Sequence, residues 1–332
     1  MAIDFQVLGK PGRDNALWLR IDSGNSVSRL LFDCGDGCLS DLSLSDIQAT
    51  DHLFFSHLHM DHVGGFDSFF RCTFNRDTKP NMVWGPAETS TILHHRFRGF
   101  LWNLHEGQPG TWLVNDVHAD RVDRYRFELS DAFQTRHLDK TTKPSNAILE
   151  EKDFSVQAIQ LEHRGPCLGY LVRENPRLNI LTDRLSGMGL LPGPWLQDLK
   201  SDSKVSEIEI EGKTWNRHEL RKKLLVETPG ESIAYLTDFL LDEPAFVLLT
   251  SLLSGCDTVL CEAQYRHSDL ELALRNYHTT TKLVSQLAVR AKIGRLVLFH
   301  LSDRYTVADR AEMLNECRAI FPNTTFPDNW AI

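Results

Sequence analysis

The chain lacks the features of secreted, membrane-spanning and disulfide-linked proteins. Its seven cysteines form no C-x-x-C pair, and their odd number does not suggest a disulfide framework. No apolar run approaches the ~20 residues that a bilayer-spanning helix requires. The N-terminus MAIDFQVLGK also lacks the basic and then apolar pattern of a signal peptide. We therefore expect a cytoplasmic protein that has no membrane partner.

An excess of positive charge is also absent, because the formal net charge is −9 at pH 7 over 332 residues. Nonspecific attraction to nucleic acid depends on a cationic surface, so an anionic substrate would have to be held by a local patch or by metal ions. The composition, with 42% hydrophobic and 24% charged residues, is ordinary for a globular protein with a sizeable core. It excludes a disordered chain.

Short apolar runs separated by turn residues predict many strands. In the first quarter of the chain these runs alternate with turns rich in glycine and aspartate, which indicates a series of hairpins. Further strands are predicted at 82–84, 154–161, 168–172, 232–236, 258–260 and 295–299. Helices are predicted at 87–97 and 279–291. Strands followed by helices in both halves suggest two packed sheets with helices outside.

One segment differs from the rest of the chain. Residues 199–230 are strongly charged and carry a hairpin-like stretch at 208–212. We predict that residues 1–332 form a single domain and that a segment at about 185–230 is a peripheral excursion from it.

The stretch FFSHLHMDHVGG, residues 54–65, holds three of the 14 histidines within six positions. Imidazole and carboxylate groups are ligands that zinc and related divalent ions take from proteins. On an extended backbone, residues two apart project the same way, so His57 and His59 can face one ion. Asp61 and His62 then lie on the turn beyond, where they can reach a second ion. A solvated loop is the simpler alternative, but so dense a cluster argues against it.

Two ions need more ligands than this stretch supplies. Three isolated residues, His163, Asp238 and His300, each follow an apolar run that reads as a buried strand. A rigid sheet can hold a side chain out to a site at such a position. Taken alone, His163 or Asp238 is more simply a hydrogen-bonded residue at the end of a strand. Together with the histidine stretch, the three complete a set of ligands for two ions.

Other motifs follow one another in a fixed order: LFDCGDG, LEHRGPCLGYLVRE, GLLPGPWLQDLK, PGESIAYLTDF and LFHLSDRY. With HLHMDH, they resemble the metallo-β-lactamase superfamily and, within it, the ribonuclease Z branch. The resemblance runs from residue 5 to 305 and so covers nearly the whole chain. It implies an α+β or α/β fold, the four-layer αββα sandwich of the metallo-β-lactamase type.

The resemblance also implies a cofactor of two divalent metal ions. Zinc is expected, although manganese and iron accept the same ligands. Seven side chains would bind the ions: His57, His59 and His163 the first, Asp61, His62 and His300 the second, and Asp238 both. Asp33 looks like the carboxylate that orients a ligand histidine. An aspartate that merely forms a turn before Cys34 is an equal alternative.

Two zinc ions ~3.5–4 Å apart can ionise a shared water to hydroxide and clamp a phosphodiester for in-line displacement, so Asp61 counts as catalytic as well as a ligand. The leaving alkoxide needs a proton, and His267 and His278 lie in one segment that could donate it. His278 is preferred because it resembles the family's His-Ser-Thr loop. Glu262 resembles a catalytic glutamate of the family, although a cysteine precedes it in place of histidine. Arg304 either pairs with a substrate phosphate or is a solvated surface residue.

The leading hypothesis is a ribonuclease Z-like endonuclease that uses metal-activated hydroxide to cleave the 3′ trailer of precursor tRNA. The alternative is a hydrolase of the same branch that acts on a small ester, such as a cyclic-nucleotide phosphodiesterase or an arylsulfatase-like enzyme. A metal-stabilised binding protein without catalysis is disfavoured, because all seven ligands are present. The partner is thus precursor tRNA or a small phosphodiester, and the resemblance implies a homodimer.

In the family, an arm inserted between the third histidine and the bridging aspartate grips the tRNA. The corresponding interval, 163–238, contains a basic cluster: Arg217, His218, Arg221, Lys222 and Lys223. Such a cluster could contact phosphates. Four glutamates in the same segment dilute its positive field, so a solvated face is the alternative.

Overall fold

The structure is a computed structural model that describes residues 3–24, 26–144, 146–201 and 205–330. Its contacts divide the chain into two compact units. The larger unit comprises the residues up to 151, 155–173 and those from 231 onward, and the smaller unit comprises 152–154 and 174–230. The segment at about 185–230, predicted to be an excursion, lies inside the smaller unit.

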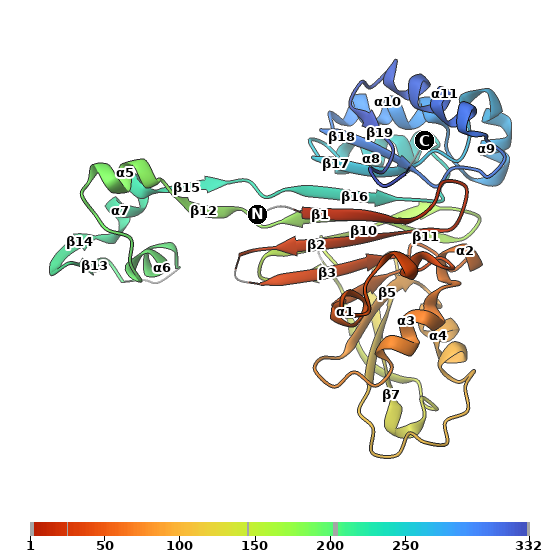
Figure 1. Ribbon diagram of the computed structural model, residues 1–332, viewed down its shortest axis with the longest axis horizontal. Coiled ribbons are helices and arrows are strands. Elements are labelled where there is room, and N and C mark those ends of the chain that lie inside the picture. Colours follow the sequence, from red (N-terminus) through yellow and green to blue (C-terminus); the bar gives the residue numbers. More distant parts are fainter. Residues whose placement is uncertain (1–2, 25, 145, 202–204, 331–332) are drawn as a thin grey trace. The chain divides into compact units, whose positions relative to one another are not determined.

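An eight-stranded sheet forms the first half of the larger unit, with its strands in chain order (Figure 1). They are β1 (Ile3–Gly9), β2 (Asn15–Asp22), β3 (Val27–Phe32), β4 (His52–Phe54), β5 (Asn81–Pro86), β6 (Thr111–Val117), β7 (Val122–Glu128) and β8 (His137–Thr142). Strands β1 to β3 are the hairpins that the first quarter of the sequence predicts. Strands β3 to β6 run parallel, and β7 and β8 are antiparallel additions at the edge.

A seven-stranded sheet forms the second half of this unit, in the order β19-β18-β17-β16-β11-β10-β9. Its strands are β9 (Leu149–Glu150), β10 (Phe154–Glu162), β11 (Pro166–Glu174), β16 (Ser232–Leu236), β17 (Thr258–Glu262), β18 (Arg295–Phe299) and β19 (Thr324–Thr325). Strands β16 to β19 are parallel to one another, whereas β11 pairs antiparallel with β16.

Helices and short 3₁₀ turns connect the strands of both sheets. Those that follow strands of the first sheet are η1 (Cys38–Asp41), α1 (Leu44–Ala49), α2 (Met60–Val63), α3 (Phe66–Thr73), α4 (Thr89–Phe97) and η2 (Leu129–Asp131). Those of the second sheet are α8 (Glu243–Leu252), η3 (His267–Asp269), α9 (Leu270–Asn276), α10 (Thr281–Ala291) and α11 (Val307–Arg318). The predicted helices at 87–97 and 279–291 correspond to α4 and α10. Each begins two residues later than expected, and Thr280 is the N-cap of α10.

Aromatic rings join the two sheets. Phe32 of β3 and Phe54 of β4 stack with centroids 4.8 Å apart, and Tyr170 of β11 lies 5.5 and 5.2 Å from their centroids. On the opposite face of the first sheet, a second core contains Phe66 of α3 and Phe97 of α4. The sheets therefore pack face to face with helices outside, and the predicted αββα fold is confirmed.

The smaller unit has its own small core. Its elements are β12 (Arg177–Ile180), α5 (Thr182–Gly187), α6 (Trp195–Lys200), β13 (Glu207–Ile210), β14 (Lys213–Asn216), α7 (Arg217–Leu224) and β15 (Leu225–Thr228). Strands β13 and β14 form the hairpin predicted at 208–212. Leu199, Leu220 and Leu224 are buried among the helices of the unit.

Within the part of the chain that the structure describes, the helices are too short or too polar to cross a membrane.

Candidate metal centre

The predicted ligands lie where neighbouring strands end. His57 and His59 follow β4, and α2 carries Asp61 and His62. In the second sheet, His163 follows β10, Asp238 follows β16 and His300 follows β18. These three strands run in the same direction, so their carboxyl ends meet at one edge of the sheet. Two packed sheets thereby bring together side chains that are far apart in the sequence.

The LFDCGDG segment, residues 31–37, is hydrogen-bonded to the histidine stretch. The backbone N–H of Cys34 donates to the His62 carbonyl at 2.8 Å, and the N–H of Gly65 donates to the Cys34 carbonyl at 2.8 Å. A Cβ atom on Gly65 would lie 2.4 Å from the carbonyl oxygen of Gly35. This approach is closer than any side chain permits, so the contact of the two segments requires glycine at 65.

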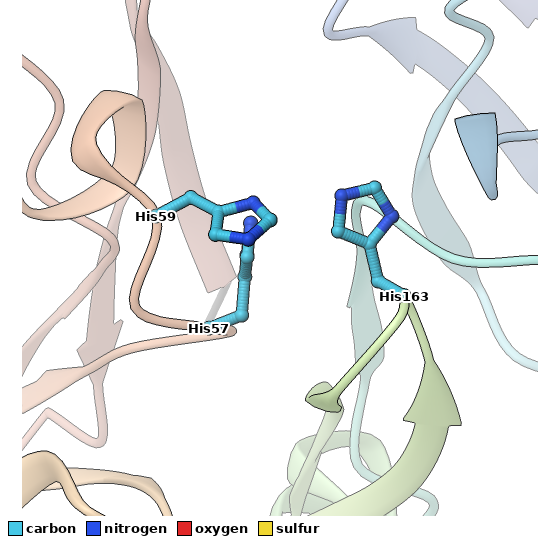
Figure 2. A group of neighbouring side chains, drawn as sticks. All are labelled: His57, His59 and His163. Atoms are coloured by element: carbon cyan, nitrogen blue, oxygen red, sulfur yellow. The ribbon is translucent and has the colours of Figure 1, made fainter.

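The seven side chains converge in two groups. The ligand atoms of His57, His59 and His163 lie within 4.8 Å of one another, and Figure 2 shows the three rings facing a common space. A second group with the same spacing contains Asp61, His62, Asp238 and His300. The structure therefore places every predicted ligand beside the others, and their role as ligands remains a prediction.

Asp238 lies between the two groups. Its Oδ2 atom is 3.7 Å from His57 Nε2 and 3.6 Å from His163 Nε2. Its Oδ1 atom is 3.5 Å from His62 Nε2 and 3.2 Å from His300 Nδ1. One carboxylate thus presents one oxygen to each group, which is the arrangement that a bridging ligand needs.

The hydrogen bonds of the histidines fit a metal centre. His57 Nε2, His62 Nε2 and His300 Nδ1 are buried without a hydrogen-bond partner among the described residues. The other ring nitrogens of His62 and His163 are held at 2.8 Å by Asp33 Oδ2 and by the Tyr277 carbonyl. Buried polar atoms without a partner are costly, and a divalent ion would satisfy them. Anchoring of the opposite nitrogen is typical of metal-bound histidine.

The charges of the site agree with this interpretation. Burial, with the neighbouring His62 charge, lowers the pKa of His57 to about 2, so that its imidazole is neutral as a ligand must be. Burial also lowers the pKa of His163. For His62 burial acts in the same direction, but the carboxylates of Asp238 and Asp33 outweigh it and raise the pKa. The surrounding carboxylates thus favour a positive charge at this position.

The backbone is strained at three residues of the site. Asp33, Asp238 and His300 have φ angles of 60°, 50° and 49°, in the left-handed region that non-glycine residues seldom adopt. Such conformations cost about 1–3 kcal/mol each and concentrate at functional sites. Each of these three residues follows a strand, and its strained conformation directs its side chain into the cluster.

Asp33 is fully buried and hydrogen-bonded on all sides. Its carboxylate accepts from the Ser56 N–H and hydroxyl, both at 2.7 Å, from the Tyr235 hydroxyl at 2.9 Å, and from His62 Nδ1. This geometry suits the predicted orienting role better than that of a simple turn residue. Sequence reasoning missed Ser56 and Tyr235, and the only sequence signal was the position of Ser56 directly before His57.

His278 lies beside the cluster. Its Nδ1 atom is 2.9 Å from Glu262 Oε2, and Glu262 Oε1 accepts the Phe239 N–H at 2.9 Å. Burial lowers the pKa of His278, but the charge of Glu262 outweighs it and raises this pKa to about 9. The ligand atoms of His278, His163 and Asp238 lie within 4.8 Å of one another.

The other two candidates lie differently. His267 bonds to Thr280 Oγ1 at 3.0 Å, and it belongs to none of the potential metal-binding groups of the described residues. Arg304 is exposed, and its guanidinium carbon lies 5.3 Å from the ring centroid of Tyr265. Tyr265 in turn packs against His278 at 5.8 Å. Arg304 therefore lies near the candidate proton donor, and its contact with a phosphate remains a prediction.

The chain is similar to known proteins over nearly its whole length. A family model described as "Anti-Pycsar protein Apyc1" matches residues 14–186. The chain is 47% identical over 324 residues to a Ribonuclease Z of Deinococcus radiodurans, covering 98% of this chain and 97% of the relative. The chain belongs to the ribonuclease Z family. A Ribonuclease Z of Prochlorococcus marinus is 29% identical over 89% of this chain and 84% of its own.

Solved structures confirm the fold of this ribonuclease Z family member. The metallo-β-lactamase fold protein YhfI of Bacillus subtilis matches with a TM-score of 0.58 at 12% identity, over 98% of this chain and 96% of its own. The short form of human tRNase Z matches with a TM-score of 0.54 at 17% identity, over 100% and 98%. The 47% identity to a Ribonuclease Z over nearly the whole chain shows that the protein is a metal-dependent hydrolase of this family, and the fold implies divalent metal ions.

Proposed function

We propose that the protein removes the 3′ trailer of precursor tRNA with two zinc ions. The observation that carries this proposal is the position of Asp238, whose two oxygens each face a separate group of histidines. A dinuclear centre suits the in-line displacement of a phosphodiester. The name Ribonuclease Z of the full-length relative supports RNA as the substrate.

The roles of the side chains follow from their contacts. His57, His59 and His163 would hold one ion, Asp61, His62 and His300 the other, and Asp238 both. When bound, the ions make water more acidic and neutralise charge on the phosphoryl oxygens. Asp33 orients His62 through its Nδ1 atom. His278, charged through its contact with Glu262, donates a proton to the leaving oxygen.

The direct test is cleavage of a precursor tRNA by the zinc-loaded protein, with Asp61→Ala compared with Asp77→Ala. Asp77 is an exposed aspartate between α3 and β5 and belongs to none of the potential metal-binding groups of the described residues. We expect Asp61→Ala to abolish cleavage and Asp77→Ala to have no effect. Metal analysis should find about two ions per chain. Preparations that contain no metal and unfold at the same temperature with and without a chelator would contradict the proposal.

The smaller unit favours a second candidate, a hydrolase of small phosphodiesters. Arg217 donates to the Asp198 carbonyl at 2.9 Å, and Arg221 donates to the carbonyls of Leu199 at 2.6 Å and Ser201 at 2.7 Å. Two members of the predicted basic cluster therefore stabilise the unit itself. Cyclic nucleotides assayed beside precursor tRNA separate the candidates, because only the second predicts faster turnover of the small substrate.

A further inference from the structure

A row of paired side chains crosses the first sheet on the face that packs against the second. Register pairs Phe54 with Trp84, Trp84 with Asn115, Asn115 with Arg124, and Arg124 with Lys140. Directly paired residues share a face of a sheet, so the row changes from aromatic through amide to cationic toward the β8 edge. Nothing in the proposed reaction uses the cationic end of this row.

This end of the row lines a cavity of about 350 Å³. Besides Trp84, Arg124 and Lys140, the segment around Lys143 and Pro144 contributes to its wall. A smaller cavity of about 170 Å³ adjoins it and shares Pro144, Ala147 and Ile148. The smaller cavity is also lined by Gln160 of β10, the strand that leads to His163. The two cavities therefore extend from the β8 edge toward β10, the strand that His163 follows.

Few carboxylates face the cations of the larger cavity. In the described part of the chain, Glu150 is the one acidic residue that lines it. Among the residues that the structure describes, no carboxylate lies within ion-pair distance of Arg124, Lys140 or Lys143. Burial lowers the pKa of Arg124, and the charge of Asp139, at the register shift between β7 and β8, partly offsets this effect without forming an ion pair. Three neighbouring cations without an ion-pair partner among the described residues are unusual in a chain of net charge −9.

Contacts with Asn115 and Trp84 position the guanidinium of Arg124. Its Nε atom donates to Asn115 Oδ1 at 2.8 Å, and Asn115 Nδ2 donates to the Val83 carbonyl at 2.8 Å. Its Cζ atom lies 5.9 Å from the Trp84 ring centroid. The terminal nitrogens of Arg124 have no hydrogen-bond partner in the described part of the chain. A preorganised fork with two free donors, beside two lysines, fits a phosphate group.

We propose that Arg124, Lys140 and Lys143 bind a phosphate of the nucleic-acid substrate at a distance from the metal centre. This inference rests on the proposed function. Strand β7, which carries Arg124, is three strand spacings from β4, or roughly 14 Å across the sheet. A small diester at the metal centre cannot span that distance, whereas an RNA strand of several nucleotides can. The pocket therefore separates polymeric from small substrates.

The test compares Lys140→Gln/Lys143→Gln with the control pair Lys282→Gln/Lys292→Gln, which removes the same charge from α10 and the residue that follows it. Binding of a labelled single-stranded RNA is measured against salt concentration in the Asp61→Ala background, where cleavage is blocked. We expect the pocket variant to bind about three- to tenfold more weakly and its salt slope to fall by about 0.7 per lost phosphate contact. The control should resemble the parent protein.

Equal affinities and equal salt slopes for the two pairs would overturn the proposal. So would a pocket that binds inorganic phosphate alone while RNA binding stays unchanged in the variant. In the otherwise native protein, bis-p-nitrophenyl phosphate hydrolysis should be the same with and without the lysine substitutions, because that substrate does not reach the pocket. If no variant hydrolyses any diester, the proposed function fails, but the binding comparison still decides about the pocket.

Discussion

Asp33 and Asp116 provide a matched pair of buried carboxylates. Each accepts hydrogen bonds from the N–H and hydroxyl of one serine, Ser56 or Ser90, but only Asp33 also contacts a predicted ligand, His62. We expect Asp33→Asn to weaken zinc binding about 10- to 100-fold, because the amide cannot hold the His62 ring in the same way. Competition with a chromophoric chelator measures the affinity.

Asp116→Asn is the control for this substitution. It removes an equivalent buried carboxylate from the end of β6, so the two variants should lose similar stability to urea. Only Asp33→Asn should lose zinc affinity. Equal zinc affinities in the two variants would show that Asp33 does not orient a ligand and is only a turn residue.

His278 and His267 allow a second comparison within one segment. We expect His278→Ala to lower kcat about 10²- to 10⁴-fold for an RNA substrate, whose ribose oxygen needs a proton to leave. The same variant should hydrolyse bis-p-nitrophenyl phosphate at nearly the normal rate, because nitrophenolate leaves without a proton. His267→Ala should change neither rate, since its ring bonds to Thr280 outside the cluster. A uniform loss for both substrates would assign His278 to metal binding or folding instead.

The sequence allowed the predicted ligand residues to be named, but not the partners that hold them. His57, His59 and His62 share one short stretch, and each remaining candidate follows an apolar run, so local pattern was enough. Tyr235 reaches Asp33 across 202 residues of chain. Such a contact depends on how two sheets pack, and no local pattern of a single sequence contains that information.

At the scale of elements, the contact between two loops depends on Gly65. A Cβ there would lie 2.4 Å from the Gly35 carbonyl oxygen and 3.0 Å from that of Cys34. We therefore expect Gly65→Ala to push the loops apart and to destabilise the protein by about 1–3 kcal/mol, with loss of zinc affinity. Urea unfolding and chelator competition measure the two effects. Gly187→Ala, where a Cβ meets nothing within 4 Å, should lower neither the stability nor the zinc affinity, because Gly187 ends helix α5 and alanine favours a helix over glycine.

The elements that the sequence predicted are those with buried apolar runs, such as β16 and β18. Strand β8, His137–Thr142, was missed because all six residues are exposed and an edge strand carries no apolar face. Helix α11 was also missed, although Thr306 and Asp309 form a capping box at its start. That signal was present in the sequence, whereas β8 offered none.

At the scale of the whole molecule, the smaller unit is joined to the larger one through neighbouring strand ends. Arg173 of β11 and Ser232 of β16 are paired residues of one antiparallel ladder. A two-residue Asn-Gly turn in place of 174–231 would therefore close a hairpin of ordinary geometry. The protein without residues 174–231 should fold, because the larger unit has its own core, and it keeps all seven predicted ligands.

This excision is the sharpest test of the substrate. If the smaller unit grips tRNA, the shortened protein keeps its activity toward bis-p-nitrophenyl phosphate, while its KM for precursor tRNA rises about tenfold or more with little change in kcat. The unfolding temperature and zinc content serve as controls for folding. Unchanged processing of precursor tRNA would show that the unit does not contribute to substrate binding. The Arg124 pocket would then be the better candidate for holding the RNA.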